Sequence, residues 1–332
     1  MKFFAALFCL LAAFTATARV PAQKLDRFVV SGSDYVRLQD WADETGLNFK
    51  WQKTSGAISL NNATSRLSLM VDSRRAEICG VNVWLSLPVV NRNGVPLVSL
   101  VDVTKTLEPI LFPPKSEARV TTICLDPGHG GKDTGEVSRH NFEKTYALLL
   151  AREVEELLRQ AGFKVVLTRR NDEFVELANR PLLAKRNRAD LFVSLHYNSA
   201  VSDIRGLEVY CLAPAGVNSS NEGGGKAPRL PEAGNMHDSQ NALLAYNVQK
   251  AVTEATHMED RGMKRSRFEV LREASMPAIL VEGGFMSNPA EARNIYDPAF
   301  RKRMAQAIVD GILAYKRAVE PVLTSAVVRS GL

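Results

Sequence analysis

Two histidines and two glutamates stand where the sequence predicts that strands end or a helix begins. His129 lies in a glycine-rich turn after one apolar run, while His196 and Glu282 each close another such run. Glu143 opens a long helical pattern. Two imidazoles and one carboxylate suit zinc, which in catalytic sites keeps three protein ligands and one position for water. Glu282 is then available as a general base, so the set predicts machinery for hydrolysing an amide.

Each of these residues also has an ordinary structural explanation. A Gly-His-Gly turn is by itself usually only a turn, a strand-end histidine can be a hydrogen-bonded core residue, and Glu143 can interact with a helix dipole. Glu282 is harder to explain in this way, because a carboxylate after an apolar strand is partly buried and needs a partner. The glycine turn fits neither a phosphate loop nor a dinucleotide fingerprint, since Asp133 stands where the third glycine of the fingerprint belongs. The metal-site hypothesis therefore rests on the combination.

The elements that must position these residues alternate strand and helix. Five apolar segments are strand-like: Val120–Asp126, Lys164–Thr168, Leu191–His196, Leu207–Leu212 and Ala278–Glu282. Four segments have helical patterns: Asn141–Gln160, Glu176–Arg188, Ser239–Ala255 and Ala299–Val319. Asn141 is a good N-cap for the first helix, and Gly162 is a good stop. We expect an α/β domain, with a twisted, mostly parallel sheet and helices on both faces. Such sheets bind ligands beyond the carboxyl ends of their strands, so His129, His196 and Glu282 are expected on one rim.

The chain divides near Pro113-Pro114, because two prolines continue neither a helix nor a central strand. The region before them holds short alternating segments and two short helical patterns, around Val36–Glu44 and Leu100–Leu107, which predicts a small α+β domain. We expect this domain at 24–112, a linker at 113–119, a catalytic domain at 120–318 and a loose tail at 319–332. Residues 213–238, rich in Gly, Ser and Pro, are expected to form a loop near the rim.

Residues 1–18 have the pattern of a secretory signal peptide. Lys2 precedes an apolar stretch from Phe3 to Phe14, and Ala16–Ala18 supplies a small-x-small cleavage site. No later segment is long and apolar enough to cross a membrane, so we expect an exported chain without stable membrane insertion. The formal charge of +6 is spread without a run of like charges, which argues against nucleic acid as a partner.

Three cysteines follow the signal segment that contains Cys9: Cys79, Cys124 and Cys211. An odd number excludes a disulfide framework, although a single disulfide stays open. Cys124 and Cys211 lie in strand-like apolar runs, so we expect them to be buried free thiols.

The second domain closely resembles the zinc-dependent N-acetylmuramoyl-L-alanine amidases of the Amidase_3 family, over roughly residues 120–317. The likeness rests on motifs in matching order and spacing: Leu125–Gly131 (LDPGHGG), Glu143-Lys144, Val193–Asn198 (VSLHYN), Arg261–Lys264 (RGMK) with Val270–Arg272 (VLR), and Val281–Asn288 (VEGGFMSN). The family cleaves the amide between the lactyl group of N-acetylmuramic acid and L-alanine of the stem peptide. The resemblance therefore implies a peptidoglycan hydrolase with one zinc ion per catalytic domain.

The resemblance also implies roles for individual residues. His129, Glu143 and His196 are the implied zinc ligands, and Glu282 is the implied catalytic carboxylate.

Three further residues take weaker assignments. Asn198, next to a ligand, is expected to contact substrate. Asp126 is expected to orient the His129 loop or a metal ligand without binding the metal itself. His140 stands one helical turn before Glu143 and competes with it as a ligand; the family places the ligand at the glutamate.

In some family members an insertion at the position of residues 213–238 covers the active site until a partner removes it. The resemblance thus leaves open an activator protein as a partner. The composition of 213–238 favours a mobile loop over a helical plug, and His237 within it is expected to face solvent.

The first domain resembles the copper-amine-oxidase N-terminal-like domain found ahead of some wall hydrolases. The likeness is carried by Gly80–Trp84 (GVNVW) and Pro96–Asp102 (PLVSLVD). Residues 19–115 contain no histidine, so no copper site is expected. Trp41, Trp51 and Trp84 all lie here, and we expect them to pack in the core rather than to stack on sugar rings.

Two other functions stay open. A zinc peptidase of the same fold would cut another bond of the stem peptide. A catalytically inactive or gated wall-binding module would use the same cleft, although the retention of all four site residues argues against it. The leading expectation is a secreted amidase, periplasmic or extracellular and associated with the cell wall.

Overall fold

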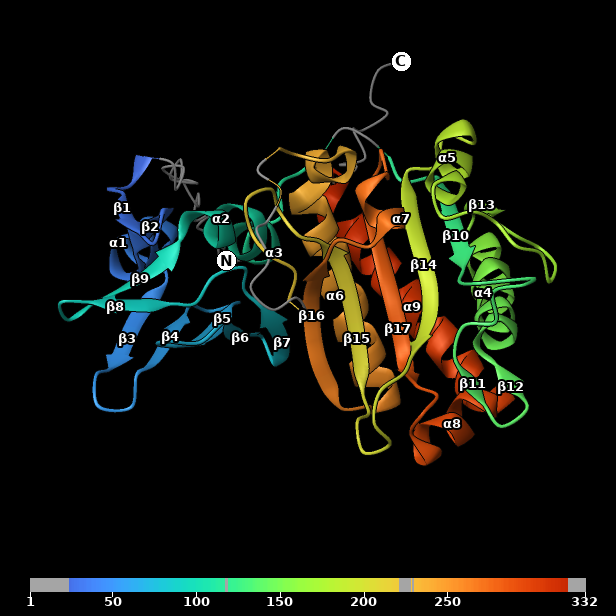
Figure 1. Ribbon diagram of the computed structural model, residues 1–332. Helices are drawn as coiled ribbons and strands as arrows, with labels where there is room; N and C mark the ends of the chain where they lie inside the picture. Colours follow the sequence, from blue (N-terminus) through green and yellow to red (C-terminus); the bar gives the residue numbers. More distant parts are fainter. Residues whose placement is uncertain (1–23, 117–118, 221–227, 229, 322–332) are drawn as a thin grey trace, which may run out of the picture.

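The computed structural model describes residues 24–116, 119–220, 228 and 230–321 (Figure 1). The expected signal peptide at 1–18, residues 221–227 and 229 of the expected loop, and residues 322–332 of the expected tail lie outside the described residues. Within the described ranges, no helix combines the length and apolar character that a membrane span requires.

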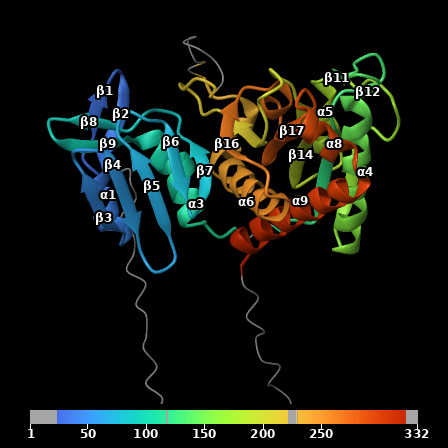
Figure 2. The same cartoon turned by 90° about the horizontal axis from the view of Figure 1, so that it is seen from below.

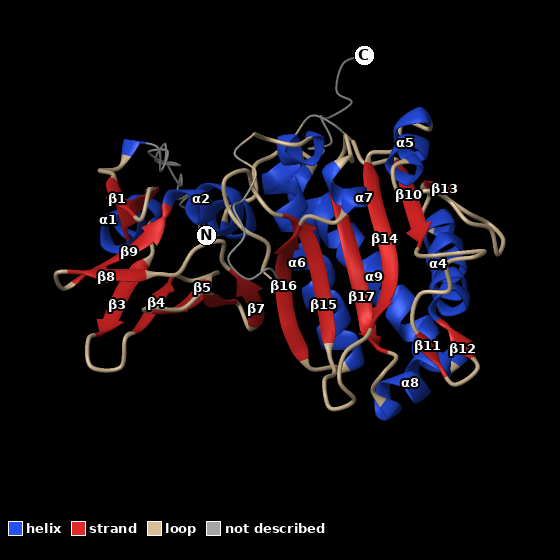
Figure 3. Ribbon diagram, viewed as in Figure 1, coloured by secondary structure: helices blue, strands red, loops and turns tan. Residues whose placement is uncertain are grey.

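Six strands build the sheet of the second half of the chain (Figure 3). They are β10 (Thr122–Pro127), β13 (Lys164–Leu167), β14 (Leu191–Asn198), β15 (Leu207–Leu212), β16 (Asp260–Ser266) and β17 (Ala278–Phe285), in the spatial order β13-β10-β14-β17-β15-β16. All neighbouring pairs are parallel except β15 and β17, which run antiparallel. The expected α/β architecture is confirmed, and the sheet is mixed rather than purely parallel.

Helices cover both faces of this sheet. The long helices α4 (Glu143–Gln160), α6 (Asp238–Thr256) and α9 (Pro298–Val319) pack on one face, and Figure 2 shows α6 and α9 side by side. The short helices α5 (Asn179–Arg186) and α7 (Glu269–Arg272) lie on the other face, and α8 (Pro289–Tyr296) packs on α9 and β17. Two short elements complete this half: the hairpin β11 (Val137–Ser138) with β12 (Asn141–Phe142), and the 3-10 helix η3 (Ala233–His237).

The alternation of side chains along the strands explains the two cores. In β14, Leu191, Val193 and Leu195 join the core under the long helices, whereas Phe192 joins the smaller core under α5 and α7. His196 continues the second series and therefore points to the face on which the short helices α5 and α7 lie. On the first face the helices pack closely, because a Cβ at Gly311 of α9 would lie 2.6 Å from the Cα of Val248 in α6.

The first half of the chain is built mainly of strands and contains two sheets. Its elements are β1 (Phe28–Val30), β2 (Ser33–Arg37), α1 (Leu38–Thr45), β3 (Asn48–Gln52), β4 (Ala57–Asn61), β5 (Arg66–Met70), β6 (Arg75–Ile78), β7 (Val81–Trp84), β8 (Val90–Arg92), β9 (Val95–Ser99), α2 (Leu100–Asp102), the π-helical turn η2 (Val103–Leu107) and α3 (Glu108–Leu111). Strands β1, β2, β9 and β8 form a small sheet, while β3 to β7 form an antiparallel meander.

The meander extends the sheet of the second half. Strand β7 pairs in parallel with β16, with Val83 opposite Met263, so that eleven described strands make one sheet. Asp260 secures the junction by accepting hydrogen bonds from the Asn82 backbone N–H (2.7 Å) and the buried Gln249 amide (2.7 Å). The domain limits at 24–112 and 120–318 stay a prediction, but the two regions share a sheet and a hydrophobic core.

The tryptophans and cysteines lie largely as expected. Trp41 is fully buried, and Trp51 and Trp84 are partly buried. All three described cysteines are free, with Cys124 and Cys211 in the interior.

One local expectation is wrong, and one strand was not predicted. Asn141 does not cap α4; it lies in β12, where its side-chain oxygen accepts a hydrogen bond from Tyr146 (2.7 Å), and Phe142 takes the N-cap position. Strand β16 was not expected, because its residues Asp-Arg-Gly-Met-Lys-Arg-Ser carry almost no apolar pattern. Several of its polar side chains instead form buried ion pairs and hydrogen bonds.

The junction can be tested by changing Asp260 to Ala. The change removes the acceptor of the Asn82 and Gly262 N–H groups and one of the two acceptors of the buried Gln249 amide, so we expect the free energy of unfolding to fall by about 2 kcal/mol. Denaturant unfolding of the whole chain measures this. The control is Asp43→Ala, which removes an exposed helix contact to Gln39 and should change stability by less than about 0.5 kcal/mol. Equal effects of the two changes would contradict the importance of the junction.

Candidate metal centre and catalytic cleft

Two buried arginines hold the loop that carries His129. Arg180 pairs with buried Asp126 (Nη1–Oδ1 2.9 Å), and its Nη2 donates to the His129 carbonyl oxygen (2.9 Å). The Nη2 of Arg169 donates to one carbonyl oxygen in this loop and to another in the first turn of α4 (2.7 Å each). The loop is therefore tied to the helix that begins with Glu143.

Asp126 organises this support. Its buried carboxylate also accepts hydrogen bonds from Thr168 Oγ1 (2.6 Å), just after β13, and from Ser194 Oγ (2.7 Å), next to it on β14. Asp126 is connected to the loop through Arg180, and its role in orienting the loop stays a prediction.

Two glycines let the side chains of the site approach one another. A Cβ at Gly128 would lie 2.3 Å from the His196 ring. A Cβ at Gly135 would lie 2.4 Å from Glu143 Oε2 and 2.6 Å from His129 Cδ2, and the φ of Gly135 is +62°. Side chains at these positions would occupy the space in which the two histidines and the glutamate meet.

His129, Glu143 and His196 converge on one point. Glu143 Oε2 lies 3.0 Å from His129 Nε2, and Glu143 Oε1 lies 3.0 Å from His196 Nδ1. One ligand atom from each residue lies within 4.8 Å of the other two. The carboxylate also accepts hydrogen bonds from the backbone N–H groups of Glu136 (2.9 Å) and Tyr197 (3.0 Å), which fix its position.

Glu143 and His129 shift each other's pKa. Burial raises the pKa of Glu143, but hydrogen bonds and charge from His129 and His196 outweigh burial and hold the pKa well below its usual range. Burial lowers the pKa of His129, but Glu143 and Asp133 outweigh it and the net pKa is raised. A buried, ionised carboxylate shared by two imidazoles is a donor set that suits zinc.

Asp133 is a site residue that sequence reasoning missed. Its carboxylate lies 2.9 Å from His129 Nδ1, so this nitrogen is engaged and Nε2 is left facing Glu143. A carboxylate on the second nitrogen fixes the orientation of a ligating imidazole. The sequence contains a signal for this contact, because Asp133 follows His129 by four residues in a tight glycine-rich turn.

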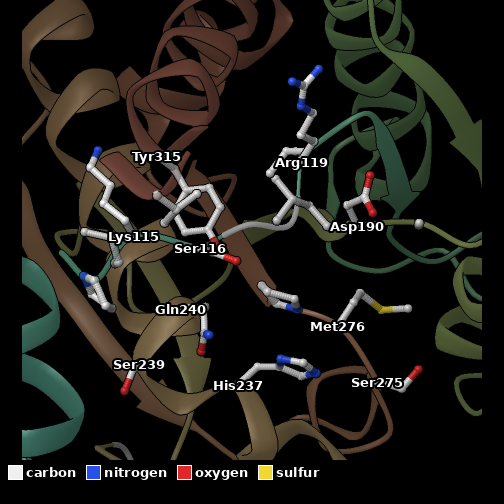
Figure 4. A pocket seen from close by; sticks show the side chains of 17 residues that line it. Lys115, Ser116, Arg119, Asp190, His237, Ser239, Gln240, Ser275, Met276 and Tyr315 are labelled. Atoms are coloured by element: carbon white, nitrogen blue, oxygen red, sulfur yellow. The ribbon is translucent and has the colours of Figure 1, made fainter. Parts of the chain in front are cut away.

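His140, the competing ligand, and His237 both lie outside the converging group. His140 is exposed, in the turn between β11 and β12, and does not belong to the converging group. His237 is partly exposed rather than fully solvent-facing, and it lines a different cavity. Figure 4 shows this second cavity, with His237, Tyr315 and Lys115 around it. It reaches Leu191, at the start of β14, whereas the converging group lies near the other end of that strand.

Glu282 faces the same cavity as the converging group. It stands in β17 directly opposite His196 in β14, and both line a cavity of about 470 Å³. Its Oε2 atom is buried and finds no hydrogen-bond partner among the described residues. Burial, followed by the charges of Glu143 and Glu208, raises its pKa well above the usual value. An unpaired carboxylate with high proton affinity is suited to accept a proton.

Asn198 lines the cavity one residue after Tyr197, at the end of β14. Its Nδ2 donates to Glu208 Oε2 (3.0 Å), and its Oδ1 accepts from the Ser199 N–H (2.8 Å). The amide therefore has a fixed orientation at the cavity wall.

The convergence can be tested by changing Gly135 to Ala. The added methyl group would displace Glu143 and His129, so we expect zinc affinity to fall roughly 10- to 100-fold while the fold is kept. Zinc titration by calorimetry measures this. The matched control is Gly162→Ala, where φ is also positive (+88°) but nothing lies within 4 Å of the added atom. Unchanged affinity in Gly135→Ala would mean that zinc binds elsewhere.

Comparison with known families agrees with this geometry. A family model described as N-acetylmuramoyl-L-alanine amidase matches residues 123–314, which is more than half of the chain. A model described as copper amine oxidase N-terminal domain matches residues 19–110.

Curated relatives are similar over the second half of the chain. The N-acetylmuramoyl-L-alanine amidase AmiA of Escherichia coli is 31% identical over 58% of this chain and 75% of its own length. AmiC of Neisseria meningitidis is 34% identical, and the chain spans about half of it (53%). YqiI of Bacillus subtilis, named as an uncharacterized protein, is 34% identical over 84% of its length.

Solved structures show the same fold. The catalytic domain of the amidase CwlV from Bacillus (Paenibacillus) polymyxa is 36% identical, with a TM-score of 0.50, and the match covers 60% of this chain and 99% of that domain. An N-acetylmuramoyl-L-alanine amidase from Clostridium difficile 630 is 32% identical, with a TM-score of 0.51 and coverage of 60% and 97%. The chain therefore belongs to the Amidase_3 family of N-acetylmuramoyl-L-alanine amidases, and its catalytic region follows a copper-amine-oxidase N-terminal-like domain.

Proposed function

We propose that the chain is a zinc-dependent amidase that cleaves the bond between the lactyl group of N-acetylmuramic acid and L-alanine of the stem peptide. The observation that carries the proposal is the convergence of His129, Glu143 and His196 beside the unpaired carboxylate of Glu282. The names of the relatives AmiA and AmiC support the choice of bond. The same site would also serve a zinc peptidase, so the choice of bond rests on the relatives' names. The complete set of four site residues argues against an inactive wall-binding module.

His129, Glu143 and His196 would hold the zinc ion, and the donor set fits it. Two neutral imidazole nitrogens and one carboxylate oxygen are the ligand types of catalytic zinc sites with an open fourth position. When bound there, zinc acts as a Lewis acid, which makes water more acidic and polarises the amide carbonyl. Asp133 holds the His129 ring through Nδ1.

Glu282 would serve as the proton carrier. Its carboxylate would accept the proton of the attacking water, because it lines the cavity beside the converging group and its Oε2 has no hydrogen-bond partner among the described residues. It then gives this proton to the nitrogen of L-alanine, so that the stem peptide leaves as an amine and the lactyl group keeps the carboxylate. Asn198 would contact the substrate at the cavity wall.

Export follows from the same proposal. The substrate lies in the cell wall, and residues 1–18 have the pattern of a signal peptide. The periplasm or the exterior is the proposed location, and peptidoglycan is the proposed partner. An activator protein and a gating role for 213–238 stay predictions.

Reaction class and cofactor can be tested together with peptidoglycan and residues 19–332. We expect release of intact stem peptide with a free L-alanine amine, loss of release with a zinc chelator, and recovery on addition of zinc. Mass spectrometry of the soluble products measures this. Products cut inside the stem peptide would instead favour a zinc peptidase, and release that the chelator does not affect would contradict the zinc mechanism.

The role of Glu282 can be tested with Glu282→Gln. Glutamine keeps the shape of the side chain but cannot take up the proton, so we expect turnover to fall about 10²- to 10⁴-fold with zinc content unchanged. Stem-peptide release and metal analysis of the same preparation measure the two quantities. Turnover near that of the wild type would rule out the general-base assignment.

A further inference from the structure

A second buried glutamate lies beside the catalytic cleft without entering it. Glu208 stands in β15 directly opposite Glu282 in β17, and only 2% of its surface is exposed. It does not belong to the residues that line the cavity. A buried carboxylate is costly unless it is paired, so its partners indicate its role.

Four side chains donate to the Glu208 carboxylate. Oε1 accepts from Lys264 Nζ (2.5 Å) and Arg261 Nε (2.6 Å), both in β16. Oε2 accepts from Tyr210 OH (2.6 Å) and Asn198 Nδ2 (3.0 Å). One oxygen is thus held by two cations, while the other is directed at Asn198.

This arrangement keeps the carboxylate charged and fixed. Burial raises the pKa of Glu208, but the hydrogen bonds from Lys264, Tyr210 and Arg261 outweigh it and lower the pKa overall. Hydrogen bonds to an ionised carboxylate are stronger than those between neutral groups. The contact with Asn198 is therefore a strong one, and it decides which end of the amide faces Glu208.

The strand that supplies the two cations is itself held by the first half of the chain. Trp84 in β7 donates from Nε1 to the Arg261 carbonyl oxygen (3.0 Å), and Lys264 Nζ lies 5.9 Å from the centre of the Trp84 ring. A continuous set of contacts thus leads from the N-terminal sheet through β16 and Glu208 to Asn198 at the cavity wall.

We propose that Glu208 is a positioning residue for substrate binding, which acts by holding the Asn198 amide in one orientation at the cavity wall. The inference rests on the proposed function, because Asn198 is assigned there to the substrate. Glu208 itself touches neither the substrate nor the converging group, so its effect on the reaction must pass through Asn198.

The test is a double-mutant cycle in the whole chain. Glu208→Gln and Asn198→Ala are each expected to raise KM for a soluble muramyl peptide about tenfold, with kcat changed less than about threefold and zinc content unchanged. In the Asn198→Ala background, Glu208→Gln should add less than about twofold. Additive effects on KM, or loss of zinc in Glu208→Gln, would overturn the inference.

Two further variants keep the test decisive. Tyr210→Phe removes only the hydroxyl that donates to Oε2 of Glu208 together with Asn198. This variant is used if Glu208→Gln does not fold. We expect it to raise KM about threefold, and we expect this increase to disappear in the Asn198→Ala background. Glu155→Gln is the matched control, a buried carboxylate in α4 paired with Arg159 and Arg170, and should leave KM unchanged. An unchanged KM in Tyr210→Phe overturns the inference if Glu208→Gln does not fold.

A failure of the inference differs from a failure of the proposed function. If the wild-type chain releases no stem peptide from the muramyl peptide, the proposed function fails and the inference fails with it. If the wild type is active and the two changes act additively, only the role of Glu208 is wrong.

Discussion

The structure of the cleft depends on one shared carboxylate. Glu143, buried at the first position of α4, lies 3.0 Å from a nitrogen of each histidine, so the helix, the β10 loop and β14 must meet at one point. An ionised group in this position would be costly on its own. It is tolerated because two imidazoles and two backbone N–H groups surround it, and a divalent cation would compensate its charge further.

The surrounding structure provides this meeting point. Asp126, Arg169 and Arg180 form a buried polar layer beneath the loop, and Gly128 and Gly135 leave the space that the side chains occupy. These three side chains are buried, and a buried charge without a partner costs free energy, so their geometry is strongly determined. On the opposite side of the cleft, Glu208 attracts the nearby cations, whereas Glu282 keeps an unpaired oxygen.

The sequence predicted the residues that meet and, of the groups that hold them, only Asp126; Asp133, Arg169 and Arg180 were not predicted. Strand ends are visible as patterns, so His129, His196 and Glu282 could be expected on one rim, whereas the resemblance to the family added Glu143. Strand β16 has no apolar alternation, because its side chains pair with charges instead of filling a core.

Other features depend on contacts far apart in the chain. The antiparallel direction of β15 is set by pairing with β17, and the junction of β7 with β16 links residues nearly 180 positions apart. Asn141 looked like a helix cap, but the local hairpin uses it for Tyr146. No local pattern in the sequence carries this information.

The most direct test of the account is the position of zinc in the protein. Anomalous diffraction at the zinc edge, from crystals of the zinc-loaded chain, should show one strong peak within about 2.0–2.2 Å of a donor atom from each of His129, Glu143 and His196. Glu282 should face this peak without being bonded to it. A peak whose ligands include His140 or Glu282 in place of one of the three, or zinc bound only elsewhere, would contradict the account.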